Sequence, residues 1–378
     1  MKPDVVFAQT TQGSLHIAKG IPCQDASCAY VDESNRFAIV AVSDGHGDPT
    51  CIRSDRGAQF AVQAAADTLQ EFAEVVLGDR GKRLEPNPLD ELHVPGHGDD
   101  IVRRITDSML SRWYDMAIED AKDDPITPDE LSRAGIFASS YVQGRDLEHG
   151  YGATLIAGLK IGNTLLLMQQ GDGRCVVLHT DGTMSEPIPW DFRCHENVTT
   201  SLCDEDAAES VRHIIMNEDA DKPAACLLMS DGVEDAFADS DGRWDWCRRL
   251  LLKLTETKHA DTRRQDFEAY LADELPGFSE NGSGDDISVS CVADMREIMH
   301  LRETLSRGID RYALEQRMSK TREKISSMER MHDYLRFRAE VGTEEDSEAF
   351  AEYHQTYSKL EDELNVLQEE FDSMDSED

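Results

Sequence analysis

Acidic residues in this chain of 378 residues stand where short apolar runs end or begin. Asp44-Gly45 and Asp231-Gly232 each follow such a run, and Asp285-Asp286 directly precedes the run Ile287–Val292. If these runs are neighbouring strands, the carboxylates lie along one edge of a sheet. Clustered carboxylates repel one another unless they are protonated or share a cation, and hard cations such as Mg²⁺ or Mn²⁺ take oxygen ligands. The pattern therefore indicates a divalent metal site.

A simpler interpretation is that each Asp-Gly pair only forms the turn of a β-hairpin. That interpretation requires a second strand directly after the turn. Asp172-Gly173 meets this requirement, because the apolar run Cys175–Leu178 follows it, so we expect a mainly structural role there. Asp44 leads instead through His46 to a helix, and Asp231 leads into a loop, so these two positions favour a site.

The elements that must position these residues belong to a sheet-rich domain. Apolar runs predict strands at Phe37–Val42, Thr164–Met168, Cys175–Leu178, Cys226–Met229 and Ile287–Val292. Helical patterns cover Ser54–Val76, Asp100–Lys122 and Trp244–Thr255, the last continuing less clearly to Leu275, and Gly78–Gly98 is predicted to be an exposed loop. Because strands outnumber helices and follow one another, we expect an α+β domain rather than an alternating parallel one.

From about Arg296 the sequence loses its prolines and nearly all its glycines, and a helical pattern takes over. Large side chains recur at alternating spacings of three and four, as in a coiled-coil seam: Phe350, Tyr353, Tyr357, Leu360, Leu364, Leu367 and Phe371. A looser apolar face precedes this seam. Gly342 can end the first helix, and Thr343 can cap the second together with Asp346. We expect a main domain at residues 1–295 and an antiparallel coiled-coil hairpin at 296–378, which pairs within or between chains. We propose that this hairpin serves self-association or the binding of a partner such as a kinase.

Composition excludes several classes of protein. Asp and Glu number 76 against 38 Lys and Arg, and the net charge of −38 argues against a nucleic-acid partner. No apolar run approaches the ~18 residues that cross a bilayer, and the first residues do not form a secretory signal. The nine cysteines are dispersed without a CxxC pair, which fits reduced thiols. We therefore expect a cytoplasmic protein without a membrane partner.

Six short motifs occur in an order that resembles a known family. They are Gln24-Asp25-Ala26, Ser43-Asp44-Gly45-His46-Gly47, Gly152-Ala153-Thr154, Gly171-Asp172-Gly173, Ser230-Asp231-Gly232 and Gly284-Asp285-Asp286-Ile287-Ser288. The order resembles metal-dependent serine/threonine protein phosphatases of type 2C, most of all the bacterial branch, from about residue 8 to residue 294. The resemblance implies an α-β-β-α sandwich, in which two antiparallel sheets pack face to face between helices.

The resemblance also implies roles for individual residues. Asp44 is similar to the carboxylate that bridges two metals, with the Gly45 carbonyl on one of them, and Asp231 and Asp285 are similar to ligands of the other. Two Mn²⁺ or Mg²⁺ ions per site would activate a water for in-line attack on a phosphate. His46 resembles the general acid that protonates the departing Ser or Thr oxygen.

Several positions depart from the family pattern. Gln24 stands where members often have a glutamate ligand, so one metal is expected to bind more weakly, while Asp25 would accept a hydrogen bond from metal-bound water. An arginine that often holds the substrate phosphate has only His16 and Lys19 as candidates, and we expect both to be solvated surface residues. His149 replaces an aspartate of members with a third metal, which argues against a third metal here.

Two functions from different classes follow. The first is hydrolysis of phosphoserine or phosphothreonine on proteins, in signalling opposite a kinase. The second is a weak or inactive phosphatase-like scaffold that binds a phosphoprotein or a kinase. Retention of Asp44, His46, Asp231 and Asp285 favours the enzyme. The sequence does not identify the substrate, the preferred metal or the role of the acidic surface.

Overall fold

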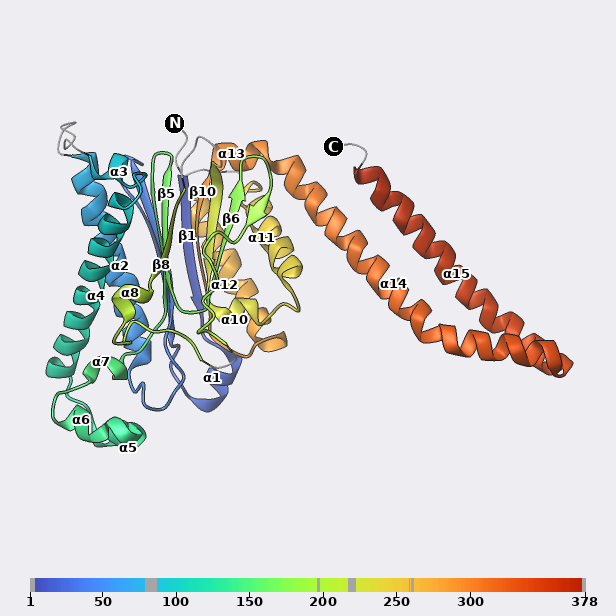
Figure 1. Cartoon of the computed structure of the whole chain (residues 1–378), viewed down its shortest axis with the longest axis horizontal. Helices are drawn as coiled ribbons and strands as arrows, with labels where there is room; N and C mark the ends of the chain where they lie inside the picture. Colours follow the sequence, from blue (N-terminus) through green and yellow to red (C-terminus); the bar gives the residue numbers. More distant parts are fainter. Residues whose placement is uncertain are drawn as a thin grey trace. The chain divides into compact units, whose positions relative to one another are not determined.

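The computed structural model describes residues 4–78, 87–195, 198–216, 222–257, 259 and 262–375. The chain divides into two compact units, Met1–Arg302 and Glu303–Asp378. Each unit is described by itself below (Figure 1). In the described residues no helix is both long enough and apolar enough to cross a membrane.

Two five-stranded antiparallel sheets form the centre of the first unit. The first sheet has the order β1-β10-β9-β6-β7 and the second the order β2-β3-β4-β5-β8. The strands are β1 (Asp4–Thr11), β2 (Asp25–Val31), β3 (Phe37–Asp44), β4 (Leu155–Ile161), β5 (Thr164–Gln170), β6 (Arg174–His179), β7 (Met184–Ser185), β8 (Arg212–Met216), β9 (Pro223–Met229) and β10 (Ile287–Asp294). The sheets pack face to face, since Val40 and Val42 of β3 share one buried cluster with Cys226 and Leu228 of β9.

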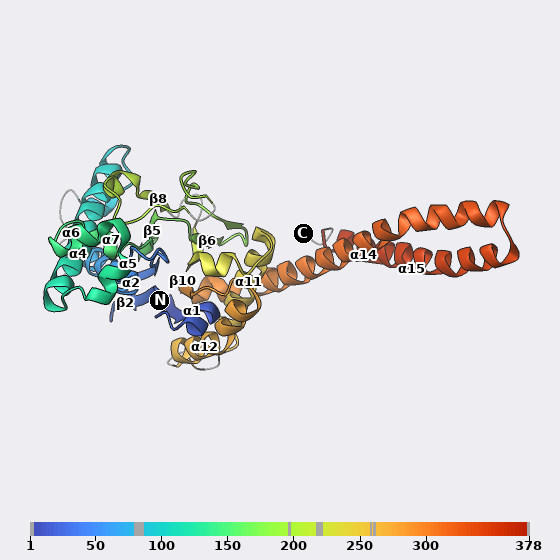
Figure 2. The same cartoon turned by 90° about the horizontal axis from the view of Figure 1, so that it is seen from below.

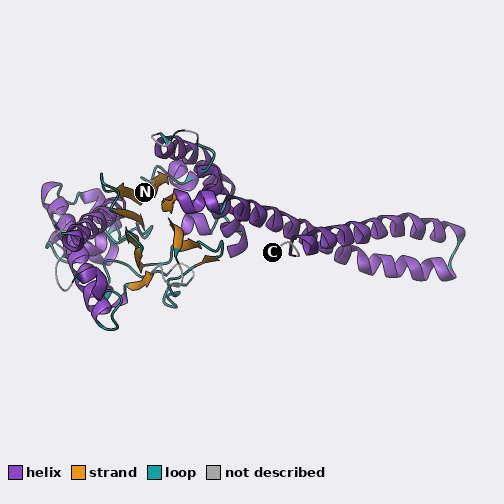
Figure 3. Cartoon of the chain, turned by 90° about the horizontal axis from the view of Figure 1, so that it is seen from above, coloured by secondary structure: helices purple, strands orange, loops and turns teal. Residues whose placement is uncertain are grey.

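Besides its strands, the first unit contains helices of different lengths. They are α1 (Ser14–Lys19), α2 (Ser54–Leu77), α3 (Pro88–Glu91), α4 (His97–Asp123), α5 (Pro128–Arg133), the 3-10 turn η2 (Gly135–Phe137), α6 (Ala138–Val142), α7 (Leu147–Gly150), α8 (Ala207–Ser210), α10 (Asp231–Glu234), α11 (Ser240–Leu254), α12 (Arg263–Asn281) and α13 (Met295–His300). Figure 1 shows α2 and α4 on one side of the sheets and α11 and α12 on the other, and Figure 3 shows the strands as inner layers. The predicted sandwich is confirmed.

Strand β3 shows how sequence dictates this layering. Its odd-numbered residues Phe37, Ile39 and Ala41 belong to the cluster that contains side chains of α2 and α4. Its even-numbered residues Ala38, Val40 and Val42 belong to the cluster between the sheets. Because successive side chains point to opposite faces, a strand covered on both faces must be apolar throughout. The strand ends at Asp44, whose position is less buried than the rest of the strand.

The predicted strands all lie within observed ones, and the first two predicted helices correspond to α2 and α4. The weak continuation to Leu275 is wrong as one helix, because α11 ends at Leu254 and α12 starts at Arg263. The predicted loop Gly78–Gly98 lies partly outside the described residues, and its last part is helical, since α4 begins at His97. Strands β1, β2, β4, β7 and β8 were not predicted.

The second unit is a helical hairpin of α14 (Arg302–Val341) and α15 (Glu344–Asp375). The helices contact each other within the chain: Arg322 donates to Gln368 over 3.2 Å, and the His332 and Tyr357 rings stack with centroids 4.3 Å apart. The Thr343 amide donates to Asp346, and the Asp346 amide donates back to the Thr343 hydroxyl, which caps α15 as predicted. Figure 2 shows the helices running side by side, so the predicted hairpin is confirmed.

Candidate active site

Acidic residues from both sheets line one cavity of about 750 Å³. Asp44 ends β3 of the second sheet, whereas Asp231 follows β9 and Asp285 precedes β10 of the first sheet. Gln24, Gly45 and His46 line the same cavity. The structure therefore brings together, at one edge of the sandwich, six of the seven residues proposed from sequence. Asp25 is not among the lining residues.

Asp25 lies directly beside the cavity. It pairs with Asp44 in the ladder between β2 and β3, and its side chain is buried. Its Oδ2 atom has no hydrogen-bond partner among the residues that the structure describes. A buried carboxylate oxygen without a partner costs free energy unless a ligand, a proton or an ordered water satisfies it. This oxygen is therefore an unused acceptor next to the clustered acids.

The backbone around Asp44 is fixed by the Gly152-Ala153-Thr154 motif. The Asp44 amide donates to Thr154 Oγ1 over 3.0 Å, and the Thr154 amide donates to the Asp44 carbonyl over 2.7 Å. Gly45 sits against neighbouring backbone, where a Cβ atom would lie 2.4 Å from the Ser54 carbonyl oxygen. No side chain fits there, so glycine at this position lets the strand end meet the start of α2.

Burial and mutual repulsion dominate the electrostatics of the acid cluster. The pKa values of Asp25 and Asp44 are raised well above their usual range, first by burial and then by neighbouring carboxylates. Burial, together with the charges of Asp172 and Asp285, raises the pKa of Asp231 to about 7. Carboxylates held this close need protons or a cation between them. The donor set consists of hard oxygen atoms, which suits a divalent cation such as Mg²⁺ or Mn²⁺.

Asp172 also lines the cavity, and this corrects our sequence interpretation. A strand does follow Asp172-Gly173, but β5 belongs to the second sheet and β6 to the first. The turn is therefore a crossover between sheets and not a hairpin. Gly171 has a φ of 100°, a conformation that favours glycine. The crossover brings Asp172 beside Asp231, whose pKa its charge raises.

Gln24 holds the loop that carries His46. Its amide nitrogen donates to the His46 carbonyl over 3.2 Å and to Ser54 Oγ. Its backbone amide donates to the Asp286 carboxylate. Because the amide nitrogen is engaged in these bonds, only its carbonyl oxygen remains as a ligand atom for a cation.

The His46 imidazole packs against Gly152. A Cβ atom at Gly152 would lie 2.8 Å from His46 Cδ2, so the glycine provides the space that the ring occupies. The His46 amide donates to the Gly152 carbonyl over 3.1 Å, which fixes the backbone as well. Burial lowers the pKa of His46, although the charges of Asp172, Asp204 and Asp48 oppose this effect. The protonated His46 ring therefore gives up its proton more readily than a protonated histidine at the surface would.

His16 lies in the cavity wall, so its expected solvated role is wrong. Its Nδ1 atom is 2.9 Å from the Asp286 carboxylate and its Nε2 atom is 3.8 Å from that of Asp285. Ligand atoms of these three residues lie within 4.8 Å of one another. Lys19 is exposed, as expected. Spacing alone could not have identified His16, because α1 and the Asp285 turn lie far apart in the sequence.

One side wall of the cavity is built around His149. Its ring stacks on Phe137 with centroids 3.8 Å apart, and its Nε2 atom lies 3.0 Å from Thr50 Oγ1. Thr50 in turn donates to the Asp48 carboxylate from both its amide and its hydroxyl. These contacts join Ile136 and Phe137 to Asp48 as one wall. His149 is thus engaged in structural contacts.

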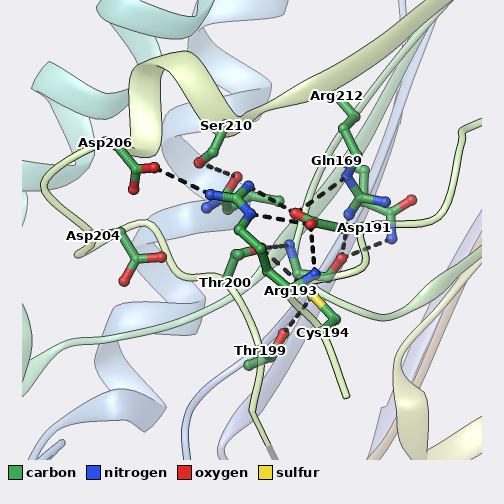
Figure 4. Close-up of polar contacts among 12 residues, drawn as sticks. Gln169, Asp191, Arg193, Cys194, Thr199, Thr200, Asp204, Asp206, Ser210 and Arg212 are labelled. Atoms are coloured by element: carbon green, nitrogen blue, oxygen red, sulfur yellow. Dashed lines mark hydrogen bonds and ion pairs between the residues drawn. The ribbon is translucent and has the colours of Figure 1, made fainter.

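Another part of the cavity wall belongs to the described residues of the segment 186–211, which an arginine network holds in place (Figure 4). Arg193 pairs with Asp191 over 2.8 Å and with Asp206 over 3.1 Å. Arg212 donates to the carbonyls of Pro189 and Gly171. The network therefore ties this segment to the crossover that carries Asp172. Sequence analysis did not assign these residues a role.

The chain matches the model of the protein phosphatase 2C family over residues 12–272. This match covers more than half of the chain, and the chain belongs to the protein phosphatase 2C family. The family suggested by the six sequence motifs is therefore confirmed. No curated protein matches the chain.

Several solved structures are similar to this chain. Serine/threonine phosphatase Stp1 from Staphylococcus aureus aligns with a TM-score of 0.44 and 15% identity, over 78% of this chain and 97% of that one. A C. elegans sex determining protein aligns with a TM-score of 0.47 and 14% identity, over 80% and 68%. The catalytic domain of protein phosphatase PstP, in complex with 2 manganese ions, aligns at 0.41 and 17%, over 77% and 97%.

Proposed function

We propose that this chain hydrolyses phosphoserine and phosphothreonine on proteins and requires a divalent cation, Mn²⁺ or Mg²⁺. The observation that carries the proposal is the convergence of Asp44, Asp231 and Asp285 from both sheets on one cavity. No lysine or arginine is among the described residues that line this cavity. The carboxylates repel a dianionic phosphate unless protons or cations neutralise them, and divalent cations would in addition attract the phosphate.

The residues present fit such cations. Asp44, Asp231 and Asp285 would hold two ions, together with the Gly45 carbonyl and the Gln24 side-chain oxygen. The unpartnered Oδ2 of Asp25 is an acceptor for a water beside them. When bound, divalent cations activate water at neutral pH and stabilise charge on the phosphoryl oxygens.

The chain's own residues would complete the reaction. As water attacks phosphorus, the bond between phosphorus and the Ser or Thr oxygen breaks, and that oxygen needs a proton to leave as an alcohol. His46 lines the cavity and would donate this proton. Gln24 and Gly152 hold His46 in place through the contacts described above. We also propose that residues 1–295 form the catalytic domain, in a cytoplasmic protein.

The test is release of phosphate from a phosphoprotein in the presence of Mn²⁺, compared with the same reaction plus a chelator. The expected result is release that stops on chelation. Binding of the phosphoprotein without release at any Mn²⁺ or Mg²⁺ concentration would favour the alternative of an inactive scaffold. The site residue that favours this alternative is Gln24, a neutral ligand whose nitrogen is already engaged.

A further inference from the structure

The proposed reaction assigns no role to four carboxylates of the cavity, which are Asp48, Asp172, Asp204 and Asp235. The charges of Asp172 and Asp235 act on Asp231, beside the proposed cation ligands. Asp48 and Asp204 both line the cavity, and the charges of both act on His46 and on His149. They come from separate segments, the loop after Asp44 and the segment 186–211. Neither has an arginine or lysine partner among the described ion pairs. The two acids therefore face the same space above the metal ligands.

Asp191 and Asp206 of the segment 186–211 pair with arginine, whereas Asp204 is in none of the ion pairs among the described residues. Arg193 binds both Asp191 and Asp206, and Arg212 lies 3.9 Å from Asp191. Figure 4 shows Asp204 outside this network. Its Oδ2 atom accepts from the Ser201 amide over 2.8 Å, which fixes the side chain without neutralising its charge. The same holds for Asp48, whose Oδ1 accepts from the amide and hydroxyl of Thr50.

An apolar surface lies in the same wall as Asp48. The Ile136 side chain is 87% exposed and Phe137 lines the cavity beside it. Phe137 is stacked on His149, which contacts Thr50, the residue that donates to Asp48. Below this wall, Glu130 of α5 is paired with buried Arg53 over 2.7 Å. The stacking of Phe137 on His149 and the ion pair of Glu130 therefore hold the segment that carries this exposed apolar surface.

We propose that this cavity selects phosphoproteins in which basic residues flank the phosphorylated Ser or Thr. The proposal rests on the proposed phosphatase function and names its substrate class. The cationic side chains of such a segment pair with Asp48 and Asp204, and their aliphatic stems cover Ile136 and Phe137. Substrates with acidic flanks are rejected by like-charge repulsion. Complementary charge at the rim of a site sets specificity in this way.

The experiment measures kcat/KM, with Mn²⁺, for three phosphothreonine peptides that differ only in flanking residues: arginine, glutamine or glutamate. The expected order is arginine, then glutamine, then glutamate, with about tenfold between the first two. Asp48→Asn and Asp204→Asn should each reduce the ratio of the arginine to the glutamine peptide several-fold, as should higher ionic strength. Glu205→Gln is the matched control, since Glu205 neighbours Asp204 but is exposed and does not line the cavity.

The outcomes separate the two proposals. Phosphate release from none of the peptides, nor from para-nitrophenyl phosphate, would contradict the proposed function itself. Equal kcat/KM for all three peptides would overturn the inference while leaving the phosphatase intact. A preference for arginine that persists in both aspartate variants would overturn it as well, because its source would lie elsewhere. A changed Mn²⁺ requirement in these variants, with the peptide ratio unchanged, would instead assign the two acids to cation binding.

Discussion

At the scale of single residues, the proton that we propose His46 donates offers the sharpest test of the chemistry. His46→Gln should reduce kcat on phosphothreonine peptides by about a hundredfold or more, the usual range for loss of a general acid. Para-nitrophenyl phosphate should lose much less, because nitrophenolate departs without a proton. Comparing both substrates in one variant separates this role from a general loss of structure.

A uniform loss on both substrates would instead assign His46 a structural role. Gly152→Ala provides a second variant with the His46 side chain retained. The added methyl group would overlap His46 Cδ2, so we expect the displaced ring to show the same dependence on the leaving group.

The acid cluster makes the metal-free protein sensitive to pH. The pKa values of Asp25, Asp44 and Asp231 are raised in the folded chain, that of Asp231 to about 7. Between the ordinary carboxyl pKa of about 4 and about 7, the folded chain therefore holds more protons than the unfolded chain. The stability of the metal-free protein should fall as pH rises through this window.

Asp44→Asn removes one of the repelling charges and tests this explanation. In chelator at neutral pH the variant should have a higher Tm than the wild type, yet show no activity with Mn²⁺. The exposed Asp107→Asn on α4 is the control and should match the wild type in both measurements. A wild-type Tm that rises with pH through the same window would contradict the cluster electrostatics.

These residues also show how far the sequence alone leads. Asp44, Asp231 and Asp285 could be predicted because each stands next to an apolar run that had to be a strand. Asp172 was misassigned because strand, Gly-Asp-Gly and strand look alike in a hairpin and in a crossover between sheets. Asp48 could be expected near the cavity because it follows His46-Gly47 closely, whereas His16 and Asp204 carry no local signal, since only the tertiary fold brings them there.

At the scale of elements, β3, β5 and β9 were predictable because both faces are buried and the runs are continuously apolar. Strands β1, β2 and β8 carry more partly buried and polar positions, so their patterns are weaker. Tertiary pairing, rather than local propensity, decides such strands. The heptad seam of α15 was predictable from local sequence alone, because its pattern is long and regular.

Arg53, only 2% exposed, joins α2 to α4 and α5. It donates to Glu130, Asp120 and Tyr151 and to the Asp124 carbonyl. Arg53→Met should destabilise the fold by about 3–5 kcal/mol, because it leaves these acceptors uncompensated. Arg56→Met is the matched control: Arg56 binds the same Asp120 but is more exposed, so we expect a loss of about 1 kcal/mol or less. Urea unfolding of both variants measures the difference.

The same contact gives a pH signature. Burial alone would raise the pKa of Glu130, but the hydrogen bond from Arg53 opposes this effect, and the pKa falls from 4.5 to about 2. This contribution to stability is present above the unfolded pKa and is lost as pH falls toward about 2. In Arg53→Met, the free energy of unfolding should therefore decrease less steeply than in the wild type as the pH becomes acidic. The same pH dependence in variant and wild type would show that the pKa of Glu130 does not depend on Arg53.

At the scale of the whole molecule, the two units can be tested by truncation. We expect a chain ending at Arg302 to retain the wild-type Tm of the first unit and Mn²⁺-dependent hydrolysis of para-nitrophenyl phosphate. A chain ending at Met295 also lacks Ile298 and Leu301, which are buried. Each such side chain contributes about 1.5–3 kcal/mol, so the shorter chain should unfold at a lower temperature.

Loss of small-ester activity in a folded chain of residues 1–302 would show that the hairpin helps to build the site. Retained activity together with a lost partner or oligomeric state would support its proposed role in association. Charge distinguishes its two helices: α14 has ten basic and seven acidic residues, whereas α15 has one and twelve. Two copies of α15 would repel each other, so α14 is the better electrostatic match for α15.

The pairing of β1 with β10 has a consequence for the order of folding. Asp4 faces Asp294 in this ladder, so the first sheet closes only after almost three hundred residues are available. The second sheet needs nothing beyond β8 and can form earlier, with the lower entropic cost of its shorter loops. Asp44 belongs to the early sheet, whereas Asp231 and Asp285 belong to the late one. If the sheets form in this order, we expect the repelling carboxylates to come together only in the last step, so that refolding of the chain should be faster with Mn²⁺ than in chelator.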